Sequence, residues 1–153
     1  MVSPAPSRGF TLPELLAVLA VLAILSAMAA PSFGALIGTM RARTTSSDLY
    51  ASLSRARSEA IKRNAQVTLA PSGAHWQDGW KIPDPADTNH LLDAHLAVPN
   101  GTVTGPASVI FLPNGRVKNG AQPSFDIAIA AQAQHRCVRL DLSGRPLQSA
   151  SGC

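Results

Sequence analysis

Residues 8–40 of this chain read RGFTLPELLAVLAVLAILSAMAAPSFGALIGTM, and positions 15–40 within this stretch carry no charged residue. An α-helix rises about 1.5 Å per residue, so twenty-odd apolar residues cover the ~30 Å hydrocarbon core of a bilayer. The apolar part of a secretory signal peptide is shorter, about 7 to 15 residues. The stretch therefore predicts a membrane-spanning helix over about residues 14–37, and its length alone leaves a plain signal anchor as an alternative.

A carboxylate stands at the start of this apolar run. Insertion scales put a charge at membrane depth at roughly 2.5 to 3.5 kcal/mol, and a plain anchor has no need of one. Glu14 is tolerated near the lipid headgroups and becomes useful when a cationic partner meets it, because opposite charges attract strongly at low dielectric. The acid therefore favours a helix that assembles with a partner.

The junction in front of the helix combines a basic residue, a glycine and an aromatic residue, with the acid four positions after the aromatic. Its residues are Arg8, Gly9, Phe10, Thr11, Leu12, Glu14 and Leu15. This pattern resembles the prepilin processing motif of type IV pilins and type II secretion pseudopilins. The resemblance implies that a prepilin peptidase removes residues 1–9 as a leader, cuts between Gly9 and Phe10, and methylates the new amino terminus of Phe10. It also implies a salt bridge between Glu14 and the Phe10 ammonium during assembly.

Two prolines mark the predicted helix. After cleavage Pro13 is the fourth residue, and the first four helix nitrogens have no intrahelical acceptor. Pro31 instead lies inside the apolar run and removes the hydrogen bond to the carbonyl of Ala27. The sequence therefore predicts a kink or a local loss of helix at Pro31, where many pilins resemble this chain.

The helix is predicted to continue past the apolar run as an amphipathic stem. Apolar positions recur there at spacings of three and four, which is typical of one buried helix face. They are Leu49, Leu53, Ala56 and Ala60. Asn64 is a suitable C-cap. We therefore predict a two-part helix over residues 10–64.

The stem also carries six basic side chains, which usually form a solvated face, with a face toward a partner or an anionic lipid as the alternative. They are Arg41, Arg43, Arg55, Arg57, Lys62 and Arg63. Because basic residues lie on both sides of the predicted span, the positive-inside rule does not settle its orientation.

From residue 65 onward the sequence changes to short strand-like runs. These runs are 67–70, 76–82, 109–112, 125–130 and 137–142, with turn signals at 113–115 and 143–144. Residues 83–106 are rich in proline, glycine and polar residues, which predicts a variable loop with one short strand near 96–98. The predicted fold class is α+β, with the long N-terminal helix packed on a small antiparallel β-sheet domain of residues 65–153.

The segment LYASLSRARSEAIKRNAQVTLAP, residues 49–71, and the pair Trp76 and Trp80 resemble the minor pseudopilin and minor pilin group called GspH and FimT. The resemblance implies a subunit that assembles into or primes a type II secretion pseudopilus or a type IV pilus. It implies as partners the prepilin peptidase, other minor and major pilins or pseudopilins, the inner-membrane assembly platform and membrane lipid. It also implies a single-pass protein of the bacterial inner membrane with its C-terminal domain in the periplasm. The two tryptophans are expected to be core or helix-packing residues rather than a ligand platform.

The two cysteines, Cys137 and Cys153, are too few for a structural zinc site. We therefore predict a disulfide between them, which would close a loop of about fifteen residues and contribute about 3 kcal/mol in the chain-entropy model. This bond requires an oxidising compartment, and two free thiols in a reducing one are the alternative.

The formal net charge of +4 is only weak evidence for nucleic-acid binding. Some members of the resembled family carry a C-terminal G-R-x-R motif whose arginines contact DNA phosphate. Gly144 and Arg145 match its first half, but Pro146 and Leu147 follow, so the second arginine is missing. Four further cations would add phosphate contacts to that of Arg145 if all of them lay on one face of the domain. They are Arg116, Lys118, Arg136 and Arg139. A DNA-binding minor pilin for natural transformation is therefore the alternative function, and DNA is not the expected partner.

Motifs for catalysis are absent from the sequence, which has no HExxH, Walker-type loop, dinucleotide fingerprint or GxSxG elbow. His90, Asp93 and His95 lie in the predicted loop without a third histidine or a cysteine nearby, so no metal site is expected. We expect no catalytic residues and no cofactor. The protein is predicted to be the substrate of an enzyme rather than an enzyme.

Overall fold

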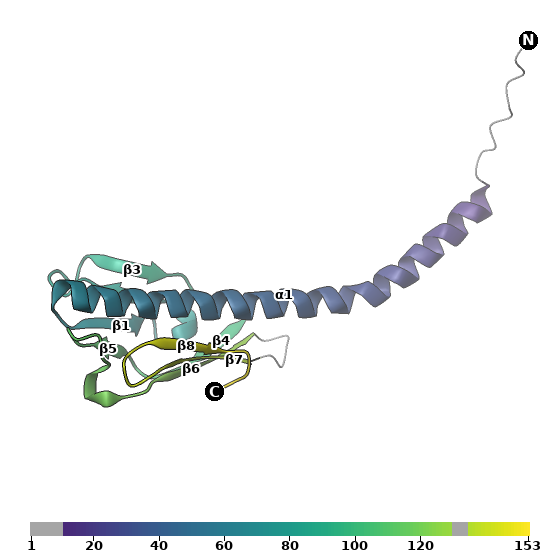
Figure 1. The fold of residues 1–153 in the computed structure, drawn as a ribbon. Coiled ribbons are helices and arrows are strands. Elements are labelled where there is room, and N and C mark those ends of the chain that lie inside the picture. Colours follow the sequence, from purple (N-terminus) through teal and green to yellow (C-terminus); the bar gives the residue numbers. More distant parts are fainter. Residues whose placement is uncertain (1–10, 130–134) are drawn as a thin grey trace, which may run out of the picture. The chain divides into compact units, whose positions relative to one another are not determined.

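The computed structural model describes residues 11–129 and 135–153, and within its helix the side chains of residues 28–32 and 35 are left out of the description. The chain divides into two units, Met1–Leu36 and Ile37–Cys153 (Figure 1). The predicted leader and the Gly9–Phe10 junction lie outside the described residues. Cleavage and methylation there stay predictions.

Helix α1 extends over Leu12–Arg63, close to the predicted 10–64. Its helical assignment continues through position 31, and the kink predicted at Pro31 remains a prediction. Within the described residues, no helical segment satisfies the length and hydropathy expected of a membrane span. Positions 28–32 and 35 of the predicted span are among those without a side-chain description.

Asn64 ends the helix, as the sequence predicted. Its φ of 48° is left-handed, a conformation that asparagine tolerates better than most residues. The Asn64 N–H donates to the carbonyl of Ile61 at 3.3 Å, and the Ala65 N–H donates to the carbonyl of Ala60 at 3.3 Å. These two bonds form a Schellman motif, which satisfies carbonyls that the helix end would otherwise leave unpaired.

Within the described residues, eight short strands form two antiparallel four-stranded sheets. The first sheet has the order β3-β2-β1-β5, with β1 at Val67–Pro71, β2 at Trp80–Pro83, β3 at Leu91–His95 and β5 at Val109–Phe111. The second has the order β4-β6-β7-β8, with β4 at Gly101–Thr104, β6 at Ser124–Ile129, β7 at His135–Leu140 and β8 at Pro146–Ser149. Two 3₁₀ turns, η1 at Trp76–Asp78 and η2 at Lys118–Gly120, lie between strands. The α+β class is therefore confirmed, with two sheets along the second part of α1 (Figure 1).

The segment predicted as a variable loop differs from the expectation. Residues 83–106 contain β3 and β4, whereas the predicted strand at 96–98 lies between them and is not a strand. Both are edge strands. Their sequences, LLDAH and GTVT, are short and partly polar, so their pairing with β2 and β6 defines them more than local propensity does. The strand β8, which begins at a proline on another edge, was missed for the same reason.

The predicted run 76–82 is interrupted. Trp76 belongs to η1, and β2 begins at Trp80 after Gly79, whose φ is 95°. A Cβ at Gly79 would lie 2.3 Å from the carbonyl oxygen of His95, so only glycine fits this approach of two backbones. The strand predicted at 137–142 begins and ends earlier in the structure, where β7 covers His135–Leu140. Asp141 already belongs to the turn after β7.

One hydrophobic core joins the stem of α1 to both sheets. The predicted stem positions are all fully buried: Leu49, Leu53, Ala56 and Ala60. Trp76 packs edge-on against Phe125 with ring centroids 4.9 Å apart, and its indole N–H donates to the carbonyl of Pro106 at 2.6 Å. Trp80 is 1% exposed. Both tryptophans are therefore core residues, as predicted.

Candidate assembly interface

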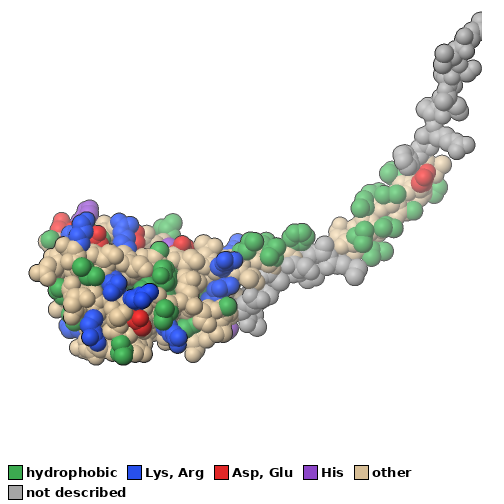
Figure 2. All heavy atoms as spheres, viewed as in Figure 1, with side chains coloured by type: hydrophobic (Ala, Val, Ile, Leu, Met, Phe, Trp, Pro, Cys, Tyr) green, Lys and Arg blue, Asp and Glu red, His purple; other side chains and the backbone are tan. Residues whose placement is uncertain are grey.

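The first part of α1 presents a continuous apolar surface. Each large hydrophobic side chain from position 12 to position 25 is between 49% and 73% exposed. Figure 2 shows hydrophobic side chains along this part of the helix on the face in view. An apolar surface of this kind is normally covered by lipid or by other helices.

Glu14 lies in the first turn of this apolar helix. Its carboxylate accepts the backbone N–H of Thr11 at 3.4 Å, while the carbonyl of Thr11 accepts the N–H of Leu15 at 3.1 Å. The first contact is one half of a capping box, and it places a negative charge at the positive end of the helix dipole. No ion pair joins Glu14 to a cation within residues 11–129 and 135–153. The predicted partner, the amino terminus of Phe10, lies outside the described residues.

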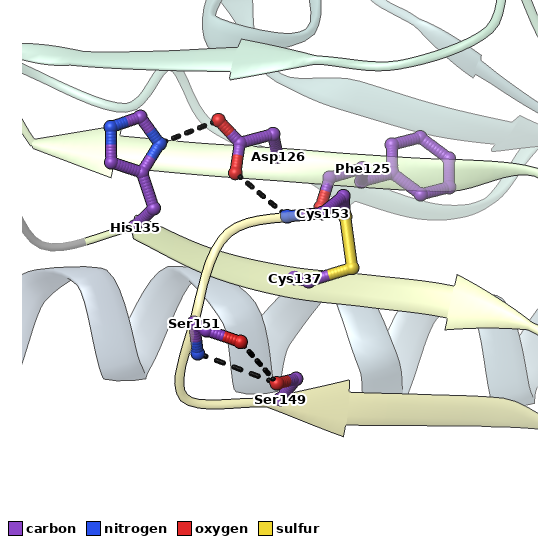
Figure 3. Close-up of a disulfide and its surroundings, with 7 residues drawn as sticks. All are labelled: Phe125, Asp126, His135, Cys137, Ser149, Ser151 and Cys153. Atoms are coloured by element: carbon purple, nitrogen blue, oxygen red, sulfur yellow. Dashed lines mark hydrogen bonds and ion pairs between the residues drawn. A yellow bond between two sulfur atoms is a disulfide. The ribbon is translucent and has the colours of Figure 1, made fainter.

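Cys137 and Cys153 form a disulfide, with an S–S distance of 2.05 Å and Cα atoms 4.9 Å apart (Figure 3). Cys137 is buried on β7, and the bond holds the C-terminal tail across β7 and β6. The neighbouring Asp126 accepts the backbone N–H of Cys153 at 3.3 Å and contacts His135 Nδ1 at 2.6 Å. The sequence reasoning missed Asp126 and His135, because only the pairing of β6 with β7 brings them beside the disulfide.

Most basic side chains of the stem have protein partners. Arg63 donates from Nε to Glu59 at 2.6 Å and from Nη1 to Asp84 at 3.0 Å. The hydrogen bond from Arg63 lowers the pKa of Glu59 below its ordinary value. The pKa of Asp84 is lowered as well, mainly by the backbone N–H of Ala86 and then by the charge of Arg63. Lys62 lies 3.8 Å from Glu59.

Two further stem arginines hold strands and turns. Arg55 forms an ion pair with Asp93 at 3.5 Å. Arg57 donates from Nε to the carbonyl oxygen of Gly115 at 3.0 Å, which ties α1 to the turn after β5. The side chains of Arg55 and Lys62 are nevertheless 56% and 75% exposed, so the basic stem is largely a solvated face, as predicted, whose side chains also contact neighbouring residues.

The candidate DNA-contacting residues are only partly brought together. A Cβ at Gly144 would lie 2.1 Å from the carbonyl oxygen of Gly115 and 3.3 Å from Cα of Arg116, so the turns that carry Arg116 and Arg145 touch. Lys118 follows two positions after Arg116. This adjacency follows from the close packing of two turns, which the sequence does not reveal.

The remaining two candidates lie on β7. Arg139 is exposed and pairs in register with Leu147, two residues after Arg145. Arg136 lies three positions earlier on the same strand, so it points to the opposite face from Arg139. The five predicted cations therefore do not share one face.

The three residues considered as metal ligands have other contacts. Asp93 contacts Arg55 and accepts a hydrogen bond from Ser52 at 3.4 Å. The His95 ring stacks on Trp80 and contacts Asp48 through Nε2 at 3.2 Å, and His90 Nδ1 lies 3.8 Å from Asp84. In the part of the chain that the structure describes, no three histidine, cysteine or acidic residues gather as a metal site would require.

Two families match this chain, and a solved fold resembles it. Residues 45–144 match the family described as type II transport protein GspH, and residues 5–30 match the prokaryotic N-terminal methylation motif. The type IV minor pilin FimU of Pseudomonas aeruginosa (strain PAO1), in a crystal form of space group P21, is similar with a TM-score of 0.62 and 20% sequence identity. This match covers 71% of the present chain and 87% of that FimU chain.

A second crystal form of FimU, in space group P65, gives a TM-score of 0.60 at 20% identity and covers 70% of the present chain and 91% of its own. At this identity the likeness concerns the fold. No curated protein matches the chain in sequence.

Proposed function

The chain belongs to the GspH family of type II transport proteins, and from this premise we propose that it is a minor subunit of a pseudopilus or pilus. In this role it assembles into, or primes, the pseudopilus of a type II secretion system or a type IV pilus. The chain is a structural subunit rather than an enzyme. The observation that carries the proposal is the exposed apolar helix at positions 12–25, which begins beside an acid.

The proposed mechanism moves this helix from lipid into a bundle of similar helices. Both surroundings cover the apolar surface, so the transfer exposes little of it to water. Glu14 then meets the ammonium group that cleavage creates at Phe10. The match of residues 5–30 to the methylation motif supports this processing, and the exposed first turn leaves the carboxylate accessible. At low dielectric an ammonium and a carboxylate are far more stable together than separately desolvated.

The proposed location follows from the same helix. We propose that the protein lies in the bacterial inner membrane, with a single span and residues 65–153 in the periplasm, and the match to the methylation motif and to the family supports this location. The Cys137–Cys153 disulfide supports an oxidising compartment for that part of the chain. Proposed partners are the prepilin peptidase, other minor and major pilins or pseudopilins, and the inner-membrane assembly platform.

The test uses full-length protein expressed with its filament system. The Glu14→Ala variant should be processed, with a mass that begins at methylated Phe10, but should be lost from sheared filaments. Glu14→Gln keeps a hydrogen-bond acceptor for Thr11 and lacks the charge, so it should also fail to incorporate if the charge matters. Normal incorporation of Glu14→Ala would contradict the pairing, and a wild-type mass beginning at Met1 or Val2 would contradict the processing.

DNA binding is the second candidate function, and one observation favours it. The turns of Arg116 and Arg145 touch, and neither guanidinium is ion-paired within the described residues. A gel shift with full-length protein in detergent should weaken steeply as salt is raised, because phosphate contacts release counterions. The Arg116→Gln/Arg145→Gln variant should bind DNA less tightly. The Arg55→Gln/Lys62→Gln variant loses the same charge from cations that already pair with Asp93 and Glu59, so it should bind DNA like the wild type. No shift at low salt would remove this candidate.

A further inference from the structure

Arg41 and Arg43 differ from the other basic residues of the stem. Within the described residues no carboxylate forms an ion pair with either guanidinium, and both side chains are exposed. The other four stem cations contact carboxylates or a backbone carbonyl, as described above. An exposed cation that the fold does not use is available to an anion outside the chain.

These two arginines are also the first charges after the apolar run. Positions 15–40 carry no charge, so Arg41 and Arg43 lie where a helix that spans a bilayer would leave the hydrocarbon. Each helical residue turns by about 100°, which places the two side chains on either side of Ala42. Ala42 is only 1% exposed, so the arginines flank the line along which α1 enters the core. Figure 2 shows basic side chains at the start of α1 within the unit Ile37–Cys153.

A groove beside Arg41 adds an apolar component. It has a volume of about 400 Å³ and lies between Ile37, Met40 and Thr44 on α1 and residues 97–99 after β3, with Arg41 among its lining residues. Ile37 is 50% exposed and Met40 is 60% exposed. The acid in its lining, Asp48, already contacts His95 at 3.2 Å. The groove therefore combines an apolar wall with Arg41, which forms no ion pair with that acid.

We propose that Arg41, Arg43 and the groove together bind anionic phospholipid of the outer leaflet of the inner membrane, an inference that rests on the membrane insertion in the proposed function. Arg41 and Arg43 each bind a headgroup phosphate on their own side of the helix, and the groove takes the upper part of one acyl chain beside Arg41. Guanidinium matches phosphate through paired hydrogen bonds, while the arginine stems lie along apolar surface. The lipid contact holds the subunit at the bilayer surface until it enters a filament.

The test is lipid binding to full-length processed protein in detergent, measured by native mass spectrometry. Titration with phosphatidylglycerol and with phosphatidylcholine should show a preference for the anionic lipid. Each arginine near an anionic headgroup should contribute roughly fivefold, so Arg41→Gln/Arg43→Gln should lose most of a preference on the order of twentyfold. Arg116→Gln/Arg145→Gln removes the same charge elsewhere and should keep the preference.

Each alternative outcome decides against the proposal. If the preference for phosphatidylglycerol survives in Arg41→Gln/Arg43→Gln, these two arginines do not cause it. If the preference disappears equally in Arg116→Gln/Arg145→Gln, it depends on the overall charge of the protein rather than on this site. Complete displacement of the lipid by inorganic phosphate at equal ionic strength would make the site a general anion site.

The groove and the assembly role are tested separately. Ala97→Trp fills the groove and keeps both arginines, so it should weaken binding of both lipids without changing the preference. Unchanged binding of both lipids by this variant would overturn the acyl-chain part of the proposal. Because the measurement needs no filament, loss of the lipid preference in a chain that still assembles would reject this inference alone, whereas the Glu14 variants test assembly.

Discussion

The rings of Trp80 and His95 stack almost parallel, with centroids 4.0 Å apart and an angle of 5° between the planes. The stack joins β2 to β3, and each ring is also bound to α1. The Trp80 indole N–H donates to Ser52 Oγ at 3.0 Å, and His95 Nε2 contacts Asp48 Oδ2 at 3.2 Å. One face of the stem therefore positions the edge strand β3 through polar contacts as well as through the core.

The Ser52→Ala substitution should destabilise the fold by about 1–3 kcal/mol, because it leaves the buried indole N–H of Trp80 without its acceptor. Urea denaturation followed by circular dichroism measures this change. Ser58→Ala is the matched control on the same helix, since Ser58 is exposed and donates to the Ser54 carbonyl of its own helix. That control should shift stability by no more than about 0.5 kcal/mol. Equal effects of the two substitutions would argue against a special role for the Trp80 contact.

Removal of the disulfide should lower stability by about 3 kcal/mol in the chain-entropy model, because the sequence separation of the two cysteines is 16. The Cys137→Ser/Cys153→Ser variant should match the reduced wild type in urea denaturation, and both should lie below the oxidised wild type. Hydrogen exchange should rise at the C-terminal tail, where Cys153 donates its N–H to Asp126. Unchanged exchange there would mean that the remaining contacts hold the tail.

The Arg63→Gln substitution should destabilise the protein at pH 7 and have less effect in acid. The pKa values of Glu59 and Asp84 are lowered in the fold, so the stability they contribute is present above their ordinary pKa values and is lost as pH falls through the folded ones. The difference in unfolding free energy between wild type and variant should therefore shrink below about pH 4. Asp84 keeps its hydrogen bond from Ala86, so its pKa should rise only in part. A difference that is constant from pH 7 to pH 3 would contradict this linkage.

Gly144→Ala should be strongly destabilising, because the added Cβ would lie 2.1 Å from the carbonyl oxygen of Gly115 at a φ of 78°. The two turns must separate, and Arg57 loses its alignment with the same carbonyl. Gly120→Ala is the matched control, since Gly120 also has a positive φ, 64°, but nothing lies within 4 Å of its added Cβ. The control should lower the free energy of unfolding by only about 1–2 kcal/mol, the strain of a left-handed backbone conformation in a residue with a Cβ. Thermal unfolding of both variants separates the clash from the backbone strain.

Local signals in the sequence predicted those parts of the fold that depend on neighbouring residues. The spacing of Leu49, Leu53, Ala56 and Ala60 identified the buried face of the stem, and Asn64 marked its end. The edge strands β3, β4 and β8 were not recognised, because short polar segments become strands only through the partners they meet.

The candidate sites divide in the same way. The predicted processing junction at Gly9 and Phe10, the acid at Glu14 and the apolar run are contiguous in the chain, so the predictions made for them depend on residue order alone. Which arginines the fold uses and which it leaves to outside partners was decided by tertiary structure. Arg57 and Gly115 are 58 positions apart, and only the packing of α1 against the turn after β5 brings them to 3.0 Å. Arg41 and Arg43 remain accessible because no carboxylate of the described residues reaches them.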